Sequence, residues 1–180
     1  MVEPSSIVIA PHRPEWGTGI VVSWAGTSAR VFFLDGGRRT VDLSVAPLSL
    51  VEPAADQVRF FSSVARTRPA DWVGQRCHHS VYAVLLSTDV RTNRRFIAKN
   101  PGMRPTKPCV YVGLTGLTPR ERFANHRAGH KGARFAGSRG LRLLPDLYER
   151  FNPMPFGVGD AFEPYLAESL RRAGYGVWQN

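Results

Sequence analysis

Short apolar segments recur along the first part of the chain, and turn residues separate them. Segments of this kind, rich in β-branched and aromatic residues, predict β-strands. They are Ile7–Ala10, Ile20–Trp24, Arg30–Leu34, Thr40–Leu43 and Leu48–Val51. Asp35-Gly36-Gly37 supplies a tight turn between two of them. Four or five short strands so close together predict a small β-barrel over residues 1–53.

The hydrophobic pattern changes after this region. Residues 54–76 read as a connector, with a short helix around Asp56–Arg66 that Thr67-Arg68-Pro69-Ala70 interrupts. We place the domain boundary in this connector and treat residues 77–180 as a second domain.

The second domain alternates strand and helix patterns. Val81–Leu86 and Val110–Val112 are apolar strands, and Tyr175-Gly176-Val177-Trp178 predicts a terminal core strand. Ser87–Pro108, between the first two strands, is polar, basic and rich in proline, so it predicts a long loop or an insertion with a short helix. The fold class expected for the whole chain is α+β.

Capping signals mark the beginning of a helix in this domain. Thr118 and Glu121 form a capping box, Pro119 occupies the first helical position, and Gly129 is a suitable end.

A last helix is predicted from about Ala161 to Ala173. Asp160 is the expected N-cap, and Gly174 the expected end. Pro164 is compatible with this helix if it lies in the first turn.

Composition narrows the class of protein. The hydrophobic content of 43% is that of a globular protein. No apolar run approaches the roughly 18 residues that span a bilayer, so no membrane association is expected. The N-terminus lacks the pattern of a secretory signal, and only two cysteines occur, Cys77 and Cys109. We therefore expect a cytoplasmic protein.

Charge is concentrated at one end of the chain. The net charge of +10 divides into −1 for residues 1–53, +2 for residues 54–76 and +9 for residues 77–180. A basic domain of this kind attracts polyanions and favours nucleic acid as a partner. A generically basic surface is the alternative reading.

Four chain segments carry candidate chemistry. Ser80-Val81-Tyr82 opens one strand, and Tyr111-Val112-Gly113-Leu114-Thr115 closes another. Arg122 and His126 lie four residues apart, so they project from one helical face. Glu163 lies near the start of the last predicted helix.

These segments, in this order, resemble the GIY-YIG nuclease superfamily over roughly residues 77–180. The expected domain is then a small, mainly antiparallel sheet flanked by helices. Ser80 replaces the first glycine of the motif, and the stretch between Tyr82 and Tyr111 is longer than in compact members. The asparagine that the family often has near its end corresponds best to Asn180, the last residue.

The first domain has a weaker resemblance. Pro14-Glu15-Trp16-Gly17-Thr18-Gly19-Ile20-Val21, together with Val45-Ala46-Pro47-Leu48, resembles the SH3/Tudor-like small barrel appended to some DNA-repair proteins. Such a barrel would be an accessory domain. Its near-neutral charge suggests a protein partner at least as readily as DNA, and a purely structural role stays open.

Each residue type suits phosphodiester hydrolysis. A carboxylate such as Glu163 can hold one divalent cation, Mg²⁺ or Mn²⁺, and the positive end of its helix would keep it ionised. Arg122 can grip two phosphate oxygens. The resemblance implies that Tyr82 is the general base and that Tyr111 orients the attacking water. Helical periodicity favours Glu163 over Glu168 as the metal ligand, because Glu163 lies at the edge of the apolar stripe.

His126 has three open readings: a phosphate ligand, a proton donor or a polar residue without a direct role. A basic tract interrupted by phenylalanines is expected to contact backbone phosphates. Its predicted nucleic-acid-binding residues are Arg120, Arg127, His130, Lys131 and Arg134. For each of them a solvated surface position is the alternative.

The expectation that follows is a metal-dependent endonuclease acting on DNA. Its alternative is a nucleic-acid-binding module that keeps the fold without the activity, an idea supported by Ser80 and by the long insertion. RNA as the substrate stays open.

Overall fold

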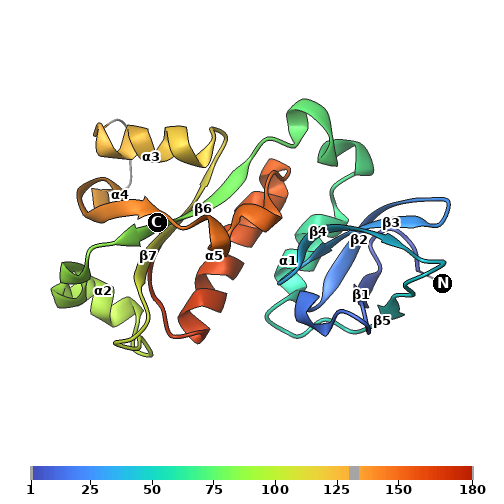
Figure 1. Ribbon diagram of the computed structural model, residues 1–180, viewed down its shortest axis with the longest axis horizontal. Helices are drawn as coiled ribbons and strands as arrows, with labels where there is room; N and C mark the ends of the chain where they lie inside the picture. The colour runs from blue at the N-terminus through green and yellow to red at the C-terminus, as the bar shows by residue number, and fades with distance from the viewer. Residues whose placement is uncertain (1, 130–133, 180) are drawn as a thin grey trace. The chain divides into compact units, whose positions relative to one another are not determined.

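The computed structural model describes residues 2–129 and 134–179, except for the side chain of Arg134. The fold is mixed α+β, and the described residues form two small sheets and five α-helices (Figure 1). The chain divides into two units. The first contains residues 1–78 and 150–161, and the second contains residues 79–149 and 162–180.

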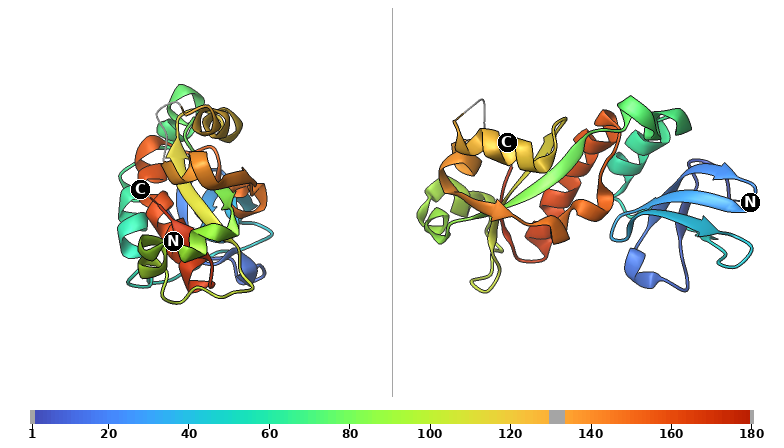
Figure 2. Two further views of the ribbon diagram at one scale, coloured as in Figure 1. Left: turned by 90° about the vertical axis from the view of Figure 1, so that its left-hand side faces the viewer. Right: turned by 45° about the horizontal axis from the view of Figure 1, so that its top comes forward.

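The sheet of the first unit has five strands in the order β4-β3-β2-β1-β5, and all neighbours are antiparallel. They are the blue and cyan strands of Figures 1 and 2. Their bounds are Ile7–Ile9 (β1), Gly19–Ala25 (β2), Ser28–Phe33 (β3), Gly37–Asp42 (β4) and Ser49–Leu50 (β5). Each strand expected from the apolar pattern is present, within a few residues of its predicted position.

Alternating apolar residues of these strands form the core of the sheet. Val8, Val21, Val31 and Phe33 are almost wholly buried. Every second side chain of a strand points to the same face, so the alternation buries one face of the sheet. This burial explains why the hydrophobic pattern alone located the strands.

The expected connector packs on this sheet. Helix α1 (Val58–Ala65) buries Phe60, whose ring centroid lies 5.5 Å from that of Phe32 on β3. Trp72, further along the connector, lies 5.8 Å from the same ring. Residues 54–76 therefore belong to the first unit and are not a free linker.

A segment from late in the chain also belongs to the first unit. Phe151 stacks on Phe32 with 5.9 Å between ring centroids, and the Nε of Arg150 donates to the carbonyl oxygen of Asp35 over 2.7 Å. This return of residues 150–161 was not foreseen, because contacts over more than a hundred residues leave no local pattern.

The sheet of the second unit has the order β8-β6-β7-β9. Its strands are Ser80–Leu86 (β6), Cys109–Thr115 (β7), Gly140–Leu143 (β8) and Gly176–Trp178 (β9). Strands β6 and β7 pair antiparallel, as do β6 and β8, whereas β9 runs parallel to β7. The predicted terminal strand is thus confirmed, and β8 is an edge strand that the sequence pattern did not indicate.

Short helices complete this unit. The stretch between β6 and β7 contains α2 (Arg94–Lys99), as expected of an insertion with a short helix. Helix α3 (Pro119–Arg127) begins with the predicted capping box, in which Thr118 Oγ1 accepts from the amide of Glu121 and the Glu121 carboxylate accepts from the amide of Thr118. Helix α4 (Arg134–Arg139) follows.

The prediction for the last helix was wrong at its beginning. Helix α5 spans Phe156–Arg172, so Asp160 lies inside it and is not its N-cap. Pro164 lies in the helix interior and removes the backbone hydrogen bond that its N–H would have made. Burial of Val158, Phe162 and other apolar side chains outweighs the breaking tendency of the glycines and the proline.

Because α5 begins earlier than predicted, Glu163 is further from its N-terminus. The residue lies in the third turn of α5, not in the first, so the positive end of the helix dipole does not act on it directly. Its place at the edge of the apolar stripe holds, because it is half-buried while Glu168 is exposed.

None of the helices in the described ranges is long and apolar enough to cross a membrane.

Candidate active site

Strand register brings the two motif tyrosines onto one face of the second sheet. In the β6–β7 pair, Tyr82 lies opposite Gly113, and Tyr111 lies opposite Val84. Tyr82, Tyr111 and Gly113 are at positions that share a face. The two phenol rings lie 5.9 Å apart between centroids, and both are buried.

Gly113 makes room for this arrangement. A Cβ at this position would lie 2.8 Å from the hydroxyl oxygen of Tyr82 and 2.8 Å from Cε1 of Tyr111. Both distances are shorter than a van der Waals contact. The glycine of the second motif is therefore required by the packing of the two rings, and not by a turn.

Helix α3 adds a third ring to the site. The hydroxyl oxygen of Tyr82 lies 2.7 Å from Nε2 of His126, and His126 is only 2% exposed. The Tyr111 and His126 rings meet edge to face at 5.9 Å. We call Tyr82, Tyr111 and His126 the ring cluster.

Arg122, one helical turn before His126, is close to the same cluster. It lies within hydrogen-bonding reach of the Tyr82 hydroxyl, and its charge lowers the pKa of Tyr82 and that of His126. The Nε atom of Arg122 is buried and has no hydrogen-bond partner among the described residues. A buried guanidinium N–H in this situation can still bind an anionic oxygen.

Glu163 on α5 completes the constellation. Its negative charge raises the pKa of Tyr82 and of Tyr111, which places it near both phenols. Gln179 Nε2 donates to the Glu163 carboxylate over 3.3 Å. Glu168, the alternative carboxylate, is exposed and pairs with Arg171 at 3.2 Å.

Burial decides the protonation state of the ring cluster. It is the largest cause of the raised pKa of Tyr82 and of Tyr111, and the hydrogen bond from Arg122 offsets it only in part for Tyr82. Burial also lowers the pKa of His126 from its ordinary value of 6.5, and Arg122 lowers it further. Near neutral pH both phenols are protonated and His126 is uncharged.

The donor set for a metal is small. No group of three or more His, Cys, Asp or Glu side chains that could hold a metal occurs in the part of the chain that the structure describes. One half-buried carboxylate, Glu163, fits a hard cation such as Mg²⁺ that keeps most of its waters. It does not fit a metal enclosed by protein ligands.

The predicted nucleic-acid contacts are described only in part. Arg120 and Arg127 are exposed on α3. His130 and Lys131 lie outside the described residues, as does the side chain of Arg134, whose backbone begins α4.

Gln179, whose side chain contacts Glu163, was not predicted as a site residue. Asn180, the position expected to match the family's asparagine, lies outside the described residues. Gln179 beside it contacts Glu163. The signal that could have identified Gln179 is its amide side chain, directly before the position that corresponds to the family's asparagine.

Comparison with known proteins bears on the first unit alone. A family described as "Protein of unknown function (DUF3553)" matches residues 2–51, which include β1 to β5 and none of the candidate-site residues. No curated protein matches the chain, and no solved structure does.

Proposed function

We propose that the second unit is a metal-dependent endonuclease of the GIY-YIG type that hydrolyses phosphodiester bonds in DNA. The observation that supports this most strongly is the convergence of Tyr82, Tyr111, Arg122, His126 and Glu163, which come from two strands and two helices. Packing alone does not require a carboxylate and a guanidinium beside two buried phenols.

The ring cluster offers a route for a proton. His126 is uncharged, so its Nε2 can accept a hydrogen bond from the Tyr82 hydroxyl when the ring proton is on Nδ1. The phenol oxygen can then accept a proton from an attacking water that replaces one of the hydrogen bonds it receives from Arg122 and Tyr111. In this scheme Tyr82 need not be ionised beforehand, which agrees with its raised pKa. Tyr111, with a still more strongly raised pKa, stays a hydrogen-bond donor that orients the water.

Arg122 is suited to the phosphate. Its buried Nε–H can bind one phosphate oxygen, and a terminal nitrogen of the planar guanidinium can bind a second. In a site of low polarity this positive charge stabilises the negative charge that develops during hydrolysis.

Glu163 would hold the cation, and Gln179 would keep its carboxylate in place. A bound Mg²⁺ would supply charge neutralisation at the phosphate and the leaving oxygen.

For the first unit we propose an SH3/Tudor-like accessory barrel. Five short antiparallel strands in the order β4-β3-β2-β1-β5 support this assignment. A protein partner or DNA would bind it, and the whole chain would act in the cytoplasm.

A cleavage assay tests the proposal. The purified chain is incubated with Mg²⁺ or Mn²⁺ and with flapped, branched, single-stranded and duplex DNA, and with RNA as a separate arm. We expect cleavage of at least one DNA substrate and a loss of at least a hundredfold in Glu163→Gln. Asp160→Asn is the matched control, because Asp160 is an exposed carboxylate on the same helix.

Absence of cleavage on every substrate would overturn the enzyme assignment. The same would follow from equal activity in wild type and Glu163→Gln. If both Glu163→Gln and Asp160→Asn lost activity, the effect would reflect the charge of α5 and not a metal ligand.

A second candidate is a nucleic-acid-binding module without activity. The burial of both tyrosines favours it, because Tyr82 and Tyr111 are almost wholly covered and an attacking water has little access to their rings. It predicts salt-sensitive binding of DNA with no turnover in any of the arms above.

A further inference from the structure

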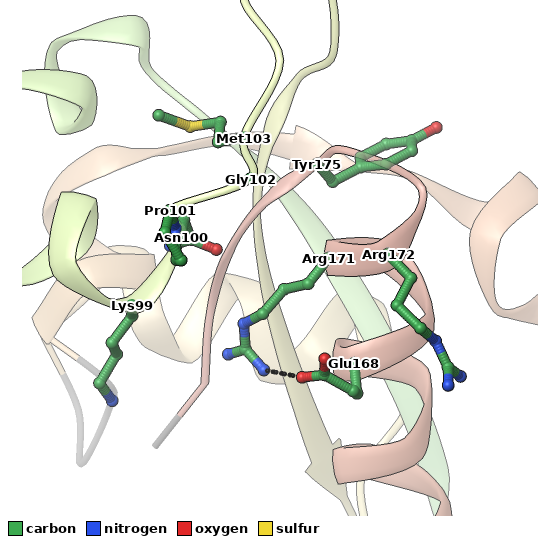
Figure 3. Close-up of a pocket in the computed structure, with 9 residues that line it drawn as sticks. All are labelled: Lys99, Asn100, Pro101, Gly102, Met103, Glu168, Arg171, Arg172 and Tyr175. Carbon is green, nitrogen blue, oxygen red and sulfur yellow. Dashed lines mark hydrogen bonds and ion pairs between the residues drawn. The ribbon is translucent and has the colours of Figure 1, made fainter. Parts of the chain in front are cut away.

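A cavity lies where the insertion between β6 and β7 meets the end of α5. It has a volume of about 510 Å³, within the range of small-ligand sites. One side comes from residues 99–103 and the other from the end of α5 and Tyr175 (Figure 3). None of the candidate active-site residues lines it.

Hydrogen bonds to backbone groups hold the walls of this pocket in place. The buried side chain of Asn100 accepts from the amide of Val177 over 2.7 Å and donates to the carbonyl oxygen of the same residue over 3.1 Å. The amide of Arg104 donates to the carbonyl oxygen of Gly174 over 2.9 Å. Gly174 has a φ of 88°, a conformation that suits glycine, and it lets the chain turn sharply after α5. The insertion is thus hydrogen-bonded to β9 and to Gly174, just after the end of α5.

Positive charge predominates around the pocket. Lys99, Arg171 and Arg172 line it, and Glu168 is the one acidic residue among the described residues of its lining. Arg172 points away from the side where Lys99 lies, whereas Arg171 extends toward that side (Figure 3). Of the three cations, Lys99 and Arg171 are therefore the two whose side chains lie toward the same part of the pocket in Figure 3.

Arg171 has unused donors. One terminal nitrogen donates to Glu168 over 3.2 Å, and its Nε is buried without a hydrogen-bond partner in the described ranges. A half-paired guanidinium keeps donors in the planar arrangement that matches a phosphate. Lys99 would add a point charge; its ammonium lies 4.6 Å from the Trp178 ring.

The rest of the lining is less polar. Pro101 and Met103 provide apolar surface, and Tyr175 provides an aromatic ring. A ligand that suits both parts carries a phosphate on one side and a flat, weakly polar group on the other. Nucleotides have this composition.

We propose that this pocket binds a nucleotide, with Arg171 and Lys99 holding its phosphate and with Met103 and Tyr175, from the two opposite walls, contacting its sugar or base. The choice of a nucleotide over other phosphate esters rests on the proposed function. The nucleotide can be a free mononucleotide or one residue of a nucleic-acid strand that passes the active site.

Titration of the full chain in the absence of divalent cations tests this proposal, because no cleavage then occurs. The probes are a nucleoside 5′-monophosphate, the corresponding nucleoside, inorganic phosphate and a short single-stranded oligonucleotide. Calorimetry gives the affinity, and the amide resonances of Gly102 and Met103 report the location. We expect the nucleotide or the oligonucleotide to shift these amides at concentrations where the nucleoside does not.

Two substitutions probe the cations separately. Arg171→Gln should raise the Kd at least tenfold, and Lys99→Gln should raise it severalfold and make it less sensitive to salt. Arg94→Gln removes the same charge from an exposed position of α2 outside the pocket, and it should leave the Kd unchanged. Thermal unfolding checks that each variant folds.

Binding of the mononucleotide would identify a free ligand, and binding of the oligonucleotide alone would identify a strand; both outcomes support the pocket. The proposal is overturned if the nucleoside or inorganic phosphate binds as tightly as the nucleotide. It is also overturned if folded Arg171→Gln and Lys99→Gln keep the wild-type Kd, or if no probe shifts the reporting amides. Because the titration needs no turnover, failure of the cleavage assay would leave this result intact.

Discussion

Replacing Gly113 with alanine would place one methyl group between the two buried tyrosine rings. The added Cβ would lie 2.8 Å from the hydroxyl oxygen of Tyr82, 2.9 Å from its Cζ and 2.8 Å from Cε1 of Tyr111. The rings cannot move easily, because Tyr82 is 1% exposed and hydrogen-bonded to His126, and Tyr111 is 4% exposed. The substitution therefore overpacks the site.

Two effects set the magnitude. Extra atoms in a packed core destabilise by about 1–3 kcal/mol. Replacing glycine where the backbone allows alanine stabilises by about 0.4–1 kcal/mol through the unfolded chain, and Gly113 does not have a positive φ. The expected net loss is about 1–2 kcal/mol in the free energy of unfolding. Displacement of Tyr82 from His126 should also reduce cleavage by more than tenfold.

Urea denaturation followed by amide resonances of β6 and β7 measures the stability of the second unit. Gly102→Ala is the matched control, since a Cβ there meets no atom within 4 Å, the residue lies in the second unit and its φ is not positive. That change should stabilise the second unit by about 0.4–1 kcal/mol through the unfolded chain. If Gly113→Ala were as stable as the wild type, the close packing of the two rings around this glycine would be refuted.

Four further predictions concern pH and stability. When cleavage is measured against pH, the loss of activity on the acid side should occur below pH 6.5. His126 must be uncharged to accept a proton, and burial and the neighbouring Arg122 guanidinium lower its pKa from 6.5. Loss of activity that begins above pH 6.5 would contradict this. The same shift makes the folded state lose stability as the pH falls below 6.5, where the unfolded chain binds the proton more readily. Asn100→Ala leaves the buried amide of Val177 without its acceptor and should lower the free energy of unfolding by about 2–4 kcal/mol, measured in urea; a loss below 1 kcal/mol would show that water replaces the side chain. Thr118→Ala removes the cap of α3 and should cost about 1 kcal/mol, whereas an unchanged midpoint in urea would mean that the capping box contributes nothing.

Local sequence patterns predicted most of the strands and the start of α3. The alternation in Thr40–Leu43 and the apolar run Val81–Leu86 marked strands, because each strand buries a face that its own residues define. The capping box at Thr118 and Glu121 located the start of α3, because its hydrogen bonds lie within one turn.

The sequence predicted Tyr82, Tyr111, Arg122, His126 and Glu163 as candidate catalytic residues, and the structure brings these side chains close to one another. Their electrostatics were not accessible. Burial of the Tyr82 ring raises its pKa more than Arg122 lowers it, and burial of this kind depends on the tertiary packing around the ring.

The sequence by itself determined where most strands form, with β8 as an exception, where α3 begins and which residues could do chemistry, because those properties depend on near neighbours in the chain. Tertiary structure alone decided that α5 continues through Pro164, that residues 150–161 join the first unit and that Gln179 meets Glu163. Each of these depends on burial or contact between segments far apart in sequence, and such contacts can outweigh the local preference of glycine, proline or a polar side chain.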